Sequence, residues 1–154
     1  MKTYEPQDDD DHSPQAIEPP TEADVDRIAR LIILAKREIR KVVGKKLIGK
    51  REDLAPINEF FEKGGQISPE VSTAFGVAFG NILVSEERDY DWWIAVYGNS
   101  REAVVRFRKT ALLFHTESFF LKRLEDGQPI HVSELYEEVV SRMRALSQKV
   151  LLTN

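Results

Sequence analysis

The chain has 154 residues, no cysteine, and ordinary shares of hydrophobic (42%) and charged (31%) residues. This length and composition predict one globular domain with a core of usual size, and they exclude disulfides, thiolate metal sites and cysteine nucleophiles. The N-terminus has no basic segment followed by an apolar run, and no apolar stretch approaches the roughly 20 residues that span a bilayer. We therefore expect a cytoplasmic protein that does not act at a membrane.

The net charge of −4 hides a strong division along the chain. Residues 1–26 contain nine acids and one base, whereas residues 27–51 contain ten bases and one acid. Residues 1–20 also contain four prolines and almost no large aliphatic side chain, so this segment cannot bury enough apolar surface to fold. We predict a disordered acidic N-terminal tail over residues 1–20 and a single α+β domain over residues 21–154.

Three helices are predicted before any strand. The first follows a capping threonine and runs from about residue 22 to 43, with apolar residues at helical spacing. The second covers residues 51–62, and the third begins at Pro69, a residue type that suits the first helical position. Within the third helix, Gly76 and Gly80 form a stripe of small residues where another element can approach closely. The sequence leaves open whether that element belongs to the same chain or to a second copy.

The hydrophobic period then changes from that of a helix to simple alternation. Residues 90–97 are predicted to form a strand with large side chains on both faces. Gly98-Asn99 is a turn signal, and residues 103–108 and 111–115 are predicted to form the next two strands of an antiparallel meander.

Two helices are predicted to close the chain. A short one ends near residue 124, and the last begins at Ser133 with an apolar face that extends through Leu146 and Val150. The predicted fold class is therefore α+β, with N-terminal helices, a three-stranded antiparallel meander and two C-terminal helices.

Four short motifs carry a family resemblance. They are Phe75-Gly76-Val77-Ala78-Phe79-Gly80, Asp91-Trp92-Trp93-Ile94, Leu112-Leu113-Phe114 and Leu121-Lys122-Arg123-Leu124-Glu125-Asp126-Gly127. Over residues 75–127 the chain thus resembles a bacterial family of a domain of unknown function. The resemblance implies an α+β domain and brings no accepted activity, cofactor or catalytic residue. His115 stands where the resemblance leads us to expect a proline.

The sequence contains no recognisable catalytic or metal-binding signature. His12, His115 and His131 lack zinc-site spacing. His115 and Glu117 could act as a base and its orienting acid, but no nucleophile motif lies nearby, so we interpret these histidines as structural. The acidic residues of 86–91 lack the spacing of a calcium loop. We predict no cofactor, no metal site and no catalytic residue, and we favour a protein that is not an enzyme.

The aromatic side chains of the predicted strand, Trp92, Trp93 and Tyr97, allow two interpretations. A strand with large rings on both faces is typical of a sheet enclosed by helices, which we favour. The alternative is that an exposed ring anchors a partner, since tryptophan and tyrosine are common anchors of interfaces.

The basic block of residues 27–51 is the most informative feature of the sequence. It can be a solvated helix face, a contact surface for another protein, or a site for the phosphates of a nucleic acid. The acidic tail could also screen it until a partner arrives. We predict a non-enzymatic binding or accessory protein that acts through a protein partner, with weak nucleic-acid binding as the alternative and an enzyme with an unrecognised site as the second alternative. The predicted contact residues are Arg30, Arg37, Lys41 and Lys45.

Overall fold

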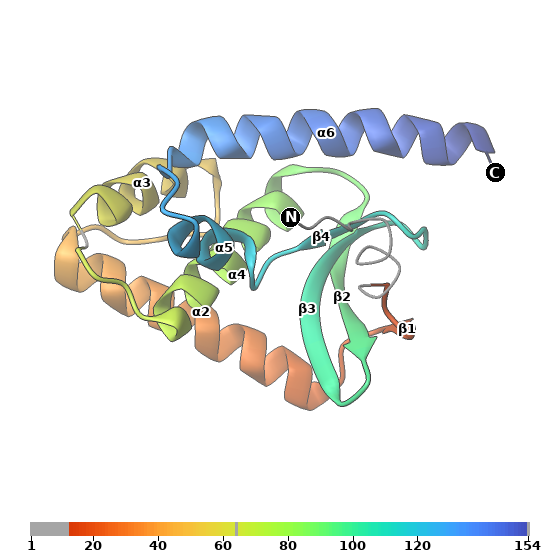
Figure 1. Cartoon of the computed structure of the whole chain (residues 1–154), viewed down its shortest axis with the longest axis horizontal. Coiled ribbons are helices and arrows are strands. Elements are labelled where there is room, and N and C mark those ends of the chain that lie inside the picture. The colour runs from red at the N-terminus through yellow and green to blue at the C-terminus, as the bar shows by residue number, and fades with distance from the viewer. Residues whose placement is uncertain (1–12, 64, 154) are drawn as a thin grey trace.

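The computed structural model describes residues 13–63 and 65–153, which form an α+β fold (Figure 1). In chain order the elements are β1 (Ala16–Glu18), α2 (Glu22–Val42), the 3₁₀ turn η1 (Arg51–Asp53), α3 (Leu54–Lys63), α4 (Pro69–Glu86), β2 (Tyr90–Tyr97), β3 (Ser100–Phe107), β4 (Leu113–His115), α5 (Phe119–Glu125) and α6 (Val132–Thr153). Helix α4 lies in the middle, with α2 on one side, α3 and α6 on the other, and the sheet at one end (Figure 1).

Helix α2 begins where the sequence predicts it. Thr21 and Asp24 form a capping box, in which the Thr21 hydroxyl accepts a hydrogen bond from the Asp24 amide (3.2 Å) and the Asp24 carboxylate accepts one from the Thr21 amide (2.8 Å). The helix buries Ile28, Ala35 and Ile39 against the core. The opposite side carries most of the basic block and faces solvent.

The small-residue stripe of α4 packs within the chain. A Cβ atom added to Gly76 would overlap the carbonyl oxygen of Thr116, in the segment between β4 and α5. One added to Gly80 would lie 2.5 Å from the Thr116 methyl carbon and 3.0 Å from the ring of Trp92. The two glycines therefore allow the chain after β4 and a tryptophan of β2 to approach the helix backbone closely. This answers the question that the sequence leaves open.

The sheet has four antiparallel strands in the order β1-β2-β3-β4. β2 and β3 form a hairpin through the predicted turn, where Gly98 has a φ of +58°. β1 pairs with the free edge of β2, with Ala16 opposite Val96 and Glu18 opposite Ile94. The prediction of three strands is corrected to four.

The additional strand comes from a segment that the sequence analysis assigned to a disordered tail. A three-residue edge strand is held mainly by backbone hydrogen bonds, such as that from the Gln15 amide to the Val96 carbonyl oxygen (2.8 Å). Three side chains carry almost no pattern, so the composition of residues 1–20 outweighed them in the prediction. Residues 1–12 of the predicted tail lie outside the described residues.

Candidate functional site

Two of the predicted contact residues, Arg30 and Arg37, border a groove between α2 and the first turns of α4. The groove has a volume of about 780 Å³. Its apolar lining is Leu31, Ile33 and Leu34, and Ile33 is 51% exposed. This lining is not among the residues predicted from the sequence to form a site. The run Leu31-Ile32-Ile33-Leu34-Ala35 does provide a signal, because one core-facing side of a helix cannot bury five consecutive apolar residues.

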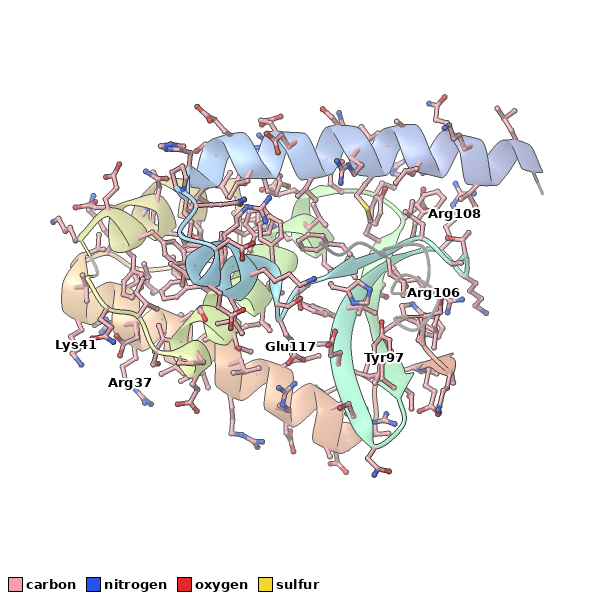
Figure 2. All side chains as sticks on the ribbon, viewed as in Figure 1. Arg37, Lys41, Tyr97, Arg106, Arg108 and Glu117 are labelled. Atoms are coloured by element: carbon pink, nitrogen blue, oxygen red, sulfur yellow. The ribbon has the colours of Figure 1, made fainter. Side chains whose placement is uncertain are left out.

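Lys41 extends the same side of α2, four residues beyond Arg37, and both side chains project away from the helix (Figure 2). Its ammonium group lies 3.9 Å from the carboxylate of Glu38, in a solvent-exposed pair that contributes little to stability. Arg30 and Arg37 form no ion pair with any residue in the described ranges. These three bases thus share one exposed face of α2.

Lys45 lies after the end of α2, in the loop that leads to η1. Gly44, with a φ of +76°, turns the chain there. The loop is held by the buried carboxylate of Asp53, which accepts hydrogen bonds from the Ile48 amide (2.9 and 3.1 Å) and the Gly49 amide (2.6 Å). Lys45 therefore lies on an anchored segment at the end of the basic face.

The two ends of the basic block serve the fold. At the first end, Arg27 forms a two-pronged ion pair with Glu117, with nitrogen–oxygen distances of 2.7 and 2.8 Å. At the other end, Arg51 pairs with Glu137 of α6 at 2.7 Å. The guanidinium of Arg51 also lies over the ring of Tyr136, 5.0 Å from its centre. The basic block therefore consists of an exposed central face between two tertiary ion pairs.

The aromatic residues of β2 divide between the two faces of the sheet. Trp92 faces α4, where its ring approaches Gly80. Trp93 lies on the opposite face, and the guanidinium of Arg106 stacks over its ring at 4.4 Å. Tyr97 lies on that same face (Figure 2). All three side chains are half-buried, so neither predicted interpretation describes the whole strand: Trp92 is enclosed by a helix, whereas Trp93 is covered by an arginine.

His115 contacts an acid, but the acid is Glu102 rather than Glu117, which the sequence offered only as a possible orienting acid. Its Nδ1 lies 3.3 Å from a Glu102 carboxylate oxygen, and its Nε2 lies 3.5 Å from the Tyr97 hydroxyl oxygen. The contact with His115 lowers the pKa of Glu102, and burial raises the pKa of Tyr97. His115 also lines a groove of about 1400 Å³ between β4, α5 and α6. Because both ring nitrogens face protein groups, we favour a structural role for this histidine over an acid–base role.

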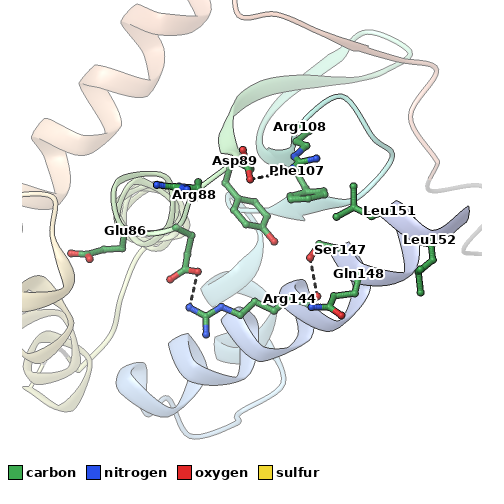
Figure 3. A pocket seen from close by; sticks show the side chains of 12 residues that line it. Glu86, Arg88, Asp89, Phe107, Arg108, Arg144, Ser147, Gln148, Leu151 and Leu152 are labelled. Carbon is green, nitrogen blue, oxygen red and sulfur yellow. Dashed lines mark hydrogen bonds and ion pairs between the residues drawn. The ribbon is translucent and has the colours of Figure 1, made fainter. Parts of the chain in front are cut away.

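The last helix is packed against the body only along its first part. Met143 is its last buried residue, and none of residues 144–152 is buried. A third groove, of about 700 Å³, lies on the side of this segment away from the groove of His115, and both Leu151 and Phe107 line it (Figure 3). Leu146 is 37% exposed. The prediction that the core-facing side extends through Leu146 is therefore wrong, because the apolar period continues beyond the point where the body ends.

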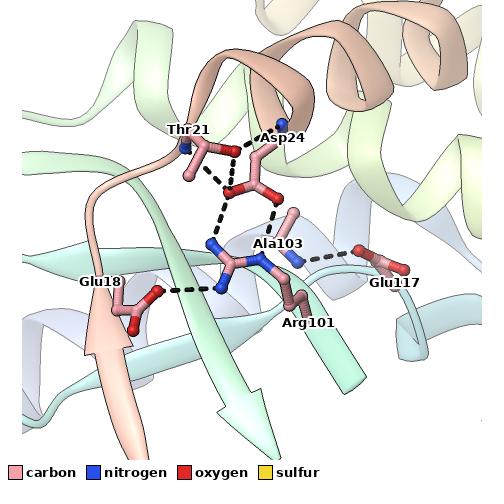
Figure 4. Close-up of polar contacts among 6 residues, drawn as sticks. All are labelled: Glu18, Thr21, Asp24, Arg101, Ala103 and Glu117. Atoms are coloured by element: carbon pink, nitrogen blue, oxygen red, sulfur yellow. Dashed lines mark hydrogen bonds and ion pairs between the residues drawn. The ribbon is translucent and has the colours of Figure 1, made fainter. Parts of the chain in front are cut away.

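A network of charges fixes the N-terminal end of α2 to the sheet (Figure 4). Arg101 of β3 donates hydrogen bonds to Asp24 (2.7 and 3.2 Å) and to Glu18 of β1 (2.9 Å). These bonds from Arg101, with further ones from Thr21, lower the pKa of Asp24 from 3.8 to about 2. Glu18 and Asp24, two of the nine acids in residues 1–26, thus bind β3 rather than the basic face of α2.

This network predicts a loss of stability in acid. Because the pKa of Asp24 is lower in the folded chain than in the unfolded chain, its contribution is present above about pH 4 and is lost as the pH falls toward about 2. We expect Asp24→Asn to lower the free energy of unfolding at neutral pH, with a difference from the original chain that shrinks in this range. Urea unfolding across the range measures it, with Asp26→Asn, an exposed acid on the same helical turn, as the control. A difference that is constant with pH would contradict the assignment.

No group of three or more histidine and acidic side chains in residues 13–63 and 65–153 is arranged to hold a metal ion. None of the described helices is both long enough and apolar enough to cross a membrane.

Comparisons with known proteins agree with an α+β fold and assign it no activity. Residues 62–136, just under half of the chain, match the family described as Domain of unknown function (DUF3806). The resemblance predicted from residues 75–127 is thereby confirmed. A crystal structure at 1.50 Å resolution of a protein from Bacteroides thetaiotaomicron VPI-5482 has a TM-score of 0.74 and 20% sequence identity to this chain. The similarity covers 84% of this chain and 49% of that one, so the chain spans about half the length of its structural neighbour. No curated protein matches the chain significantly.

Proposed function

We propose that this chain is a non-enzymatic binding protein whose α2–α4 groove takes an acidic, partly apolar segment of a protein partner. The observation that carries the proposal is the position of Ile33, 51% exposed in a groove bordered by Arg30 and Arg37. An apolar centre with a charged rim is the usual arrangement of a protein interface, and arginine is enriched there.

The charge of the rim determines the kind of partner. Arg30 and Arg37 form no ion pair within the described ranges, Glu70 is the one acid that lines the groove with them, and Lys41 has only a distant exposed partner. An acidic segment would supply that charge and would also be attracted toward the groove before contact. The exposed Ile33 favours a polypeptide over a nucleic acid as the partner. Nucleic-acid phosphates are bound by lysine and arginine side chains, and such contacts would leave the aliphatic side chain of Ile33 without a partner.

Reversing the charge of Arg37, at the edge of the groove, and of the two exposed bases beyond it, Lys41 and Lys45, should remove binding. We expect the triple variant Arg37→Glu/Lys41→Glu/Lys45→Glu to capture its partner from a nuclease-treated lysate at least about tenfold less well than the original chain. All three side chains are exposed, so the fold should be retained. The matched control reverses three exposed bases away from α2, namely Arg88, Lys109 and Lys122.

Three results would count against the proposal or redirect it. Undiminished capture by the triple variant would exclude the basic face as the contact surface. Equal loss in the control would show that overall charge, and not this groove, governs capture. Capture that disappears with nuclease would support nucleic-acid binding instead. A form that begins at Ser13 keeps β1, and stronger capture by this form would support screening of the groove by the acidic residues 1–12.

A further inference from the structure

The exposed part of α6 has the features of an interface that no contact within the described chain explains. None of residues 144–152 is buried, although this segment contains three leucines. Leu146, Leu151 and Leu152 are 37%, 46% and 86% exposed. Three of the six large hydrophobic residues that are exposed in the described chain thus lie within two turns of one helix. Such a concentration on a helix that projects from the body is typical of an interaction surface.

The charges of α6 divide into those used by the fold and those left free. Glu137 pairs with η1 through Arg51, and Arg144 pairs with the segment after α4 through Glu87. Four other exposed charges form no ion pair with any described residue: Glu134, Glu138, Arg142 and Lys149. They recur at intervals of four, four and seven residues, so they lie along one side of the helix, with both acids before both bases.

We propose that this side of α6 pairs with α6 of a second copy of the chain, in antiparallel orientation about a two-fold axis near Ser141. In that arrangement Glu134 lies opposite Lys149 of the second copy, and Arg142 lies within one turn of Glu138 of the second copy. Two exposed residues near the axis, Ser141 and Ala145, have small side chains that allow the two helices to approach closely. A two-fold axis repeats each contact, so the same surface serves both copies.

The order of the charges favours a second copy over other occupants. A purely acidic or purely basic partner would match only half of this side, and a parallel pair of α6 helices would bring like charges together. An antiparallel copy satisfies all four charges with one surface.

Leu146 and Leu152 supply much of the free energy, since exposed ion pairs contribute little, whereas Leu151 faces the other groove, beside Phe107. Leu146 lines the groove of about 1400 Å³ beside Glu138 and Arg142. The second copy would border that groove, which also contains His115. The ion pairs would then set the orientation of the two helices, and the burial of leucine would hold them together.

Charge exchange tests this pairing directly. Sedimentation of the full chain at about 0.5 mM should show a dimer, a concentration at which an association with a Kd of about 50 μM is largely complete. Glu134→Lys/Glu138→Lys makes the surface wholly basic, and Arg142→Glu/Lys149→Glu makes it wholly acidic. Each variant alone should sediment as a monomer. An equimolar mixture of the two should form a heterodimer, because each surface then faces its opposite.

The control reverses two exposed charges elsewhere, Glu125→Lys and Lys109→Glu, and should leave the dimer intact. Circular dichroism verifies that every variant is folded. A full chain that remains a monomer at this concentration overturns the proposal, and so does a dimer that both charge variants preserve. If the two variants are monomers that do not combine on mixing, the antiparallel arrangement is wrong. None of these readouts depends on the groove of α2, so this pairing and the proposed function fail or succeed separately.

Discussion

Gly76→Ala should destabilise the chain by about 2 kcal/mol or more, although alanine is the better helix former. A helix interior normally gains about 1 kcal/mol from this change. Here the new methyl group would overlap the carbonyl oxygen of Thr116, which is a backbone atom and cannot rotate away. Forcing an extra carbon into a packed core costs about 1–3 kcal/mol and sometimes more, because neighbouring segments must shift. For a chain of this size, 2 kcal/mol lowers the melting temperature by about 4–8 °C.

Gly80→Ala is a milder form of the same change and serves as the comparison for Gly76→Ala. Its added methyl group would meet the Thr116 methyl at 2.5 Å and the Trp92 ring at 3.0 Å, and both are side-chain atoms that can move. We therefore expect a smaller loss for Gly80→Ala, measured by thermal and urea unfolding of both variants in dilute solution. If Gly76→Ala were as stable as the original chain, the close approach of the segment after β4 would be wrong. The use of dilute solution separates this effect from any change in association.

The sequence predicted the elements whose own residues determine them. The Thr21 cap and the apolar spacing placed the start of α2 correctly, and strict alternation placed both ends of β2. The role of Gly76 was only partly predictable, because four-residue spacing indicates a close approach but does not identify the segment that approaches. The same holds for Leu146, since the apolar period continues along α6 without showing where the body of the protein ends.

The candidate site shows the same division between local and tertiary information. The exposed bases of α2 follow from helical spacing alone, and the structure places Arg30, Arg37 and Lys41 on one face as expected. The groove beside Arg30 and Arg37 requires Glu70 and Thr73 of α4, which come more than thirty residues later in the chain. The sequence offered Glu117 only as a possible orienting acid for His115, and the contact is with Glu102 instead, because neighbours across a sheet depend on strand register. Glu117, two residues away in sequence, turns instead toward Arg27.

Glu117→Ala should destabilise the chain by about 1–4 kcal/mol, because Glu117 joins three parts of the fold. Its carboxylate accepts two hydrogen bonds from Arg27 of α2 and one from the Ala103 amide of β3 (2.8 Å), and its own segment packs on α4. Truncation leaves the amide of Ala103, a residue only 1% exposed, without its acceptor. An unsatisfied buried amide costs about 1–3 kcal/mol. Loss of the ion pair adds up to about 1 kcal/mol, because the Arg27 side chain is 43% exposed and partly screened.

Two companion variants separate these contributions. Glu117→Gln keeps a carbonyl oxygen that can accept from Ala103, so we expect it to recover about half of the loss. Arg27→Ala removes the ion pair and leaves the Ala103 bond intact, so it should cost no more than about 1 kcal/mol. Urea unfolding of the three single variants and of the double variant Arg27→Ala/Glu117→Ala gives the coupling between the two side chains. If Arg27→Ala proved as damaging as Glu117→Ala, the ion pair rather than the buried amide would be the main contribution. The position of α2 against β3 would then depend mainly on that arginine.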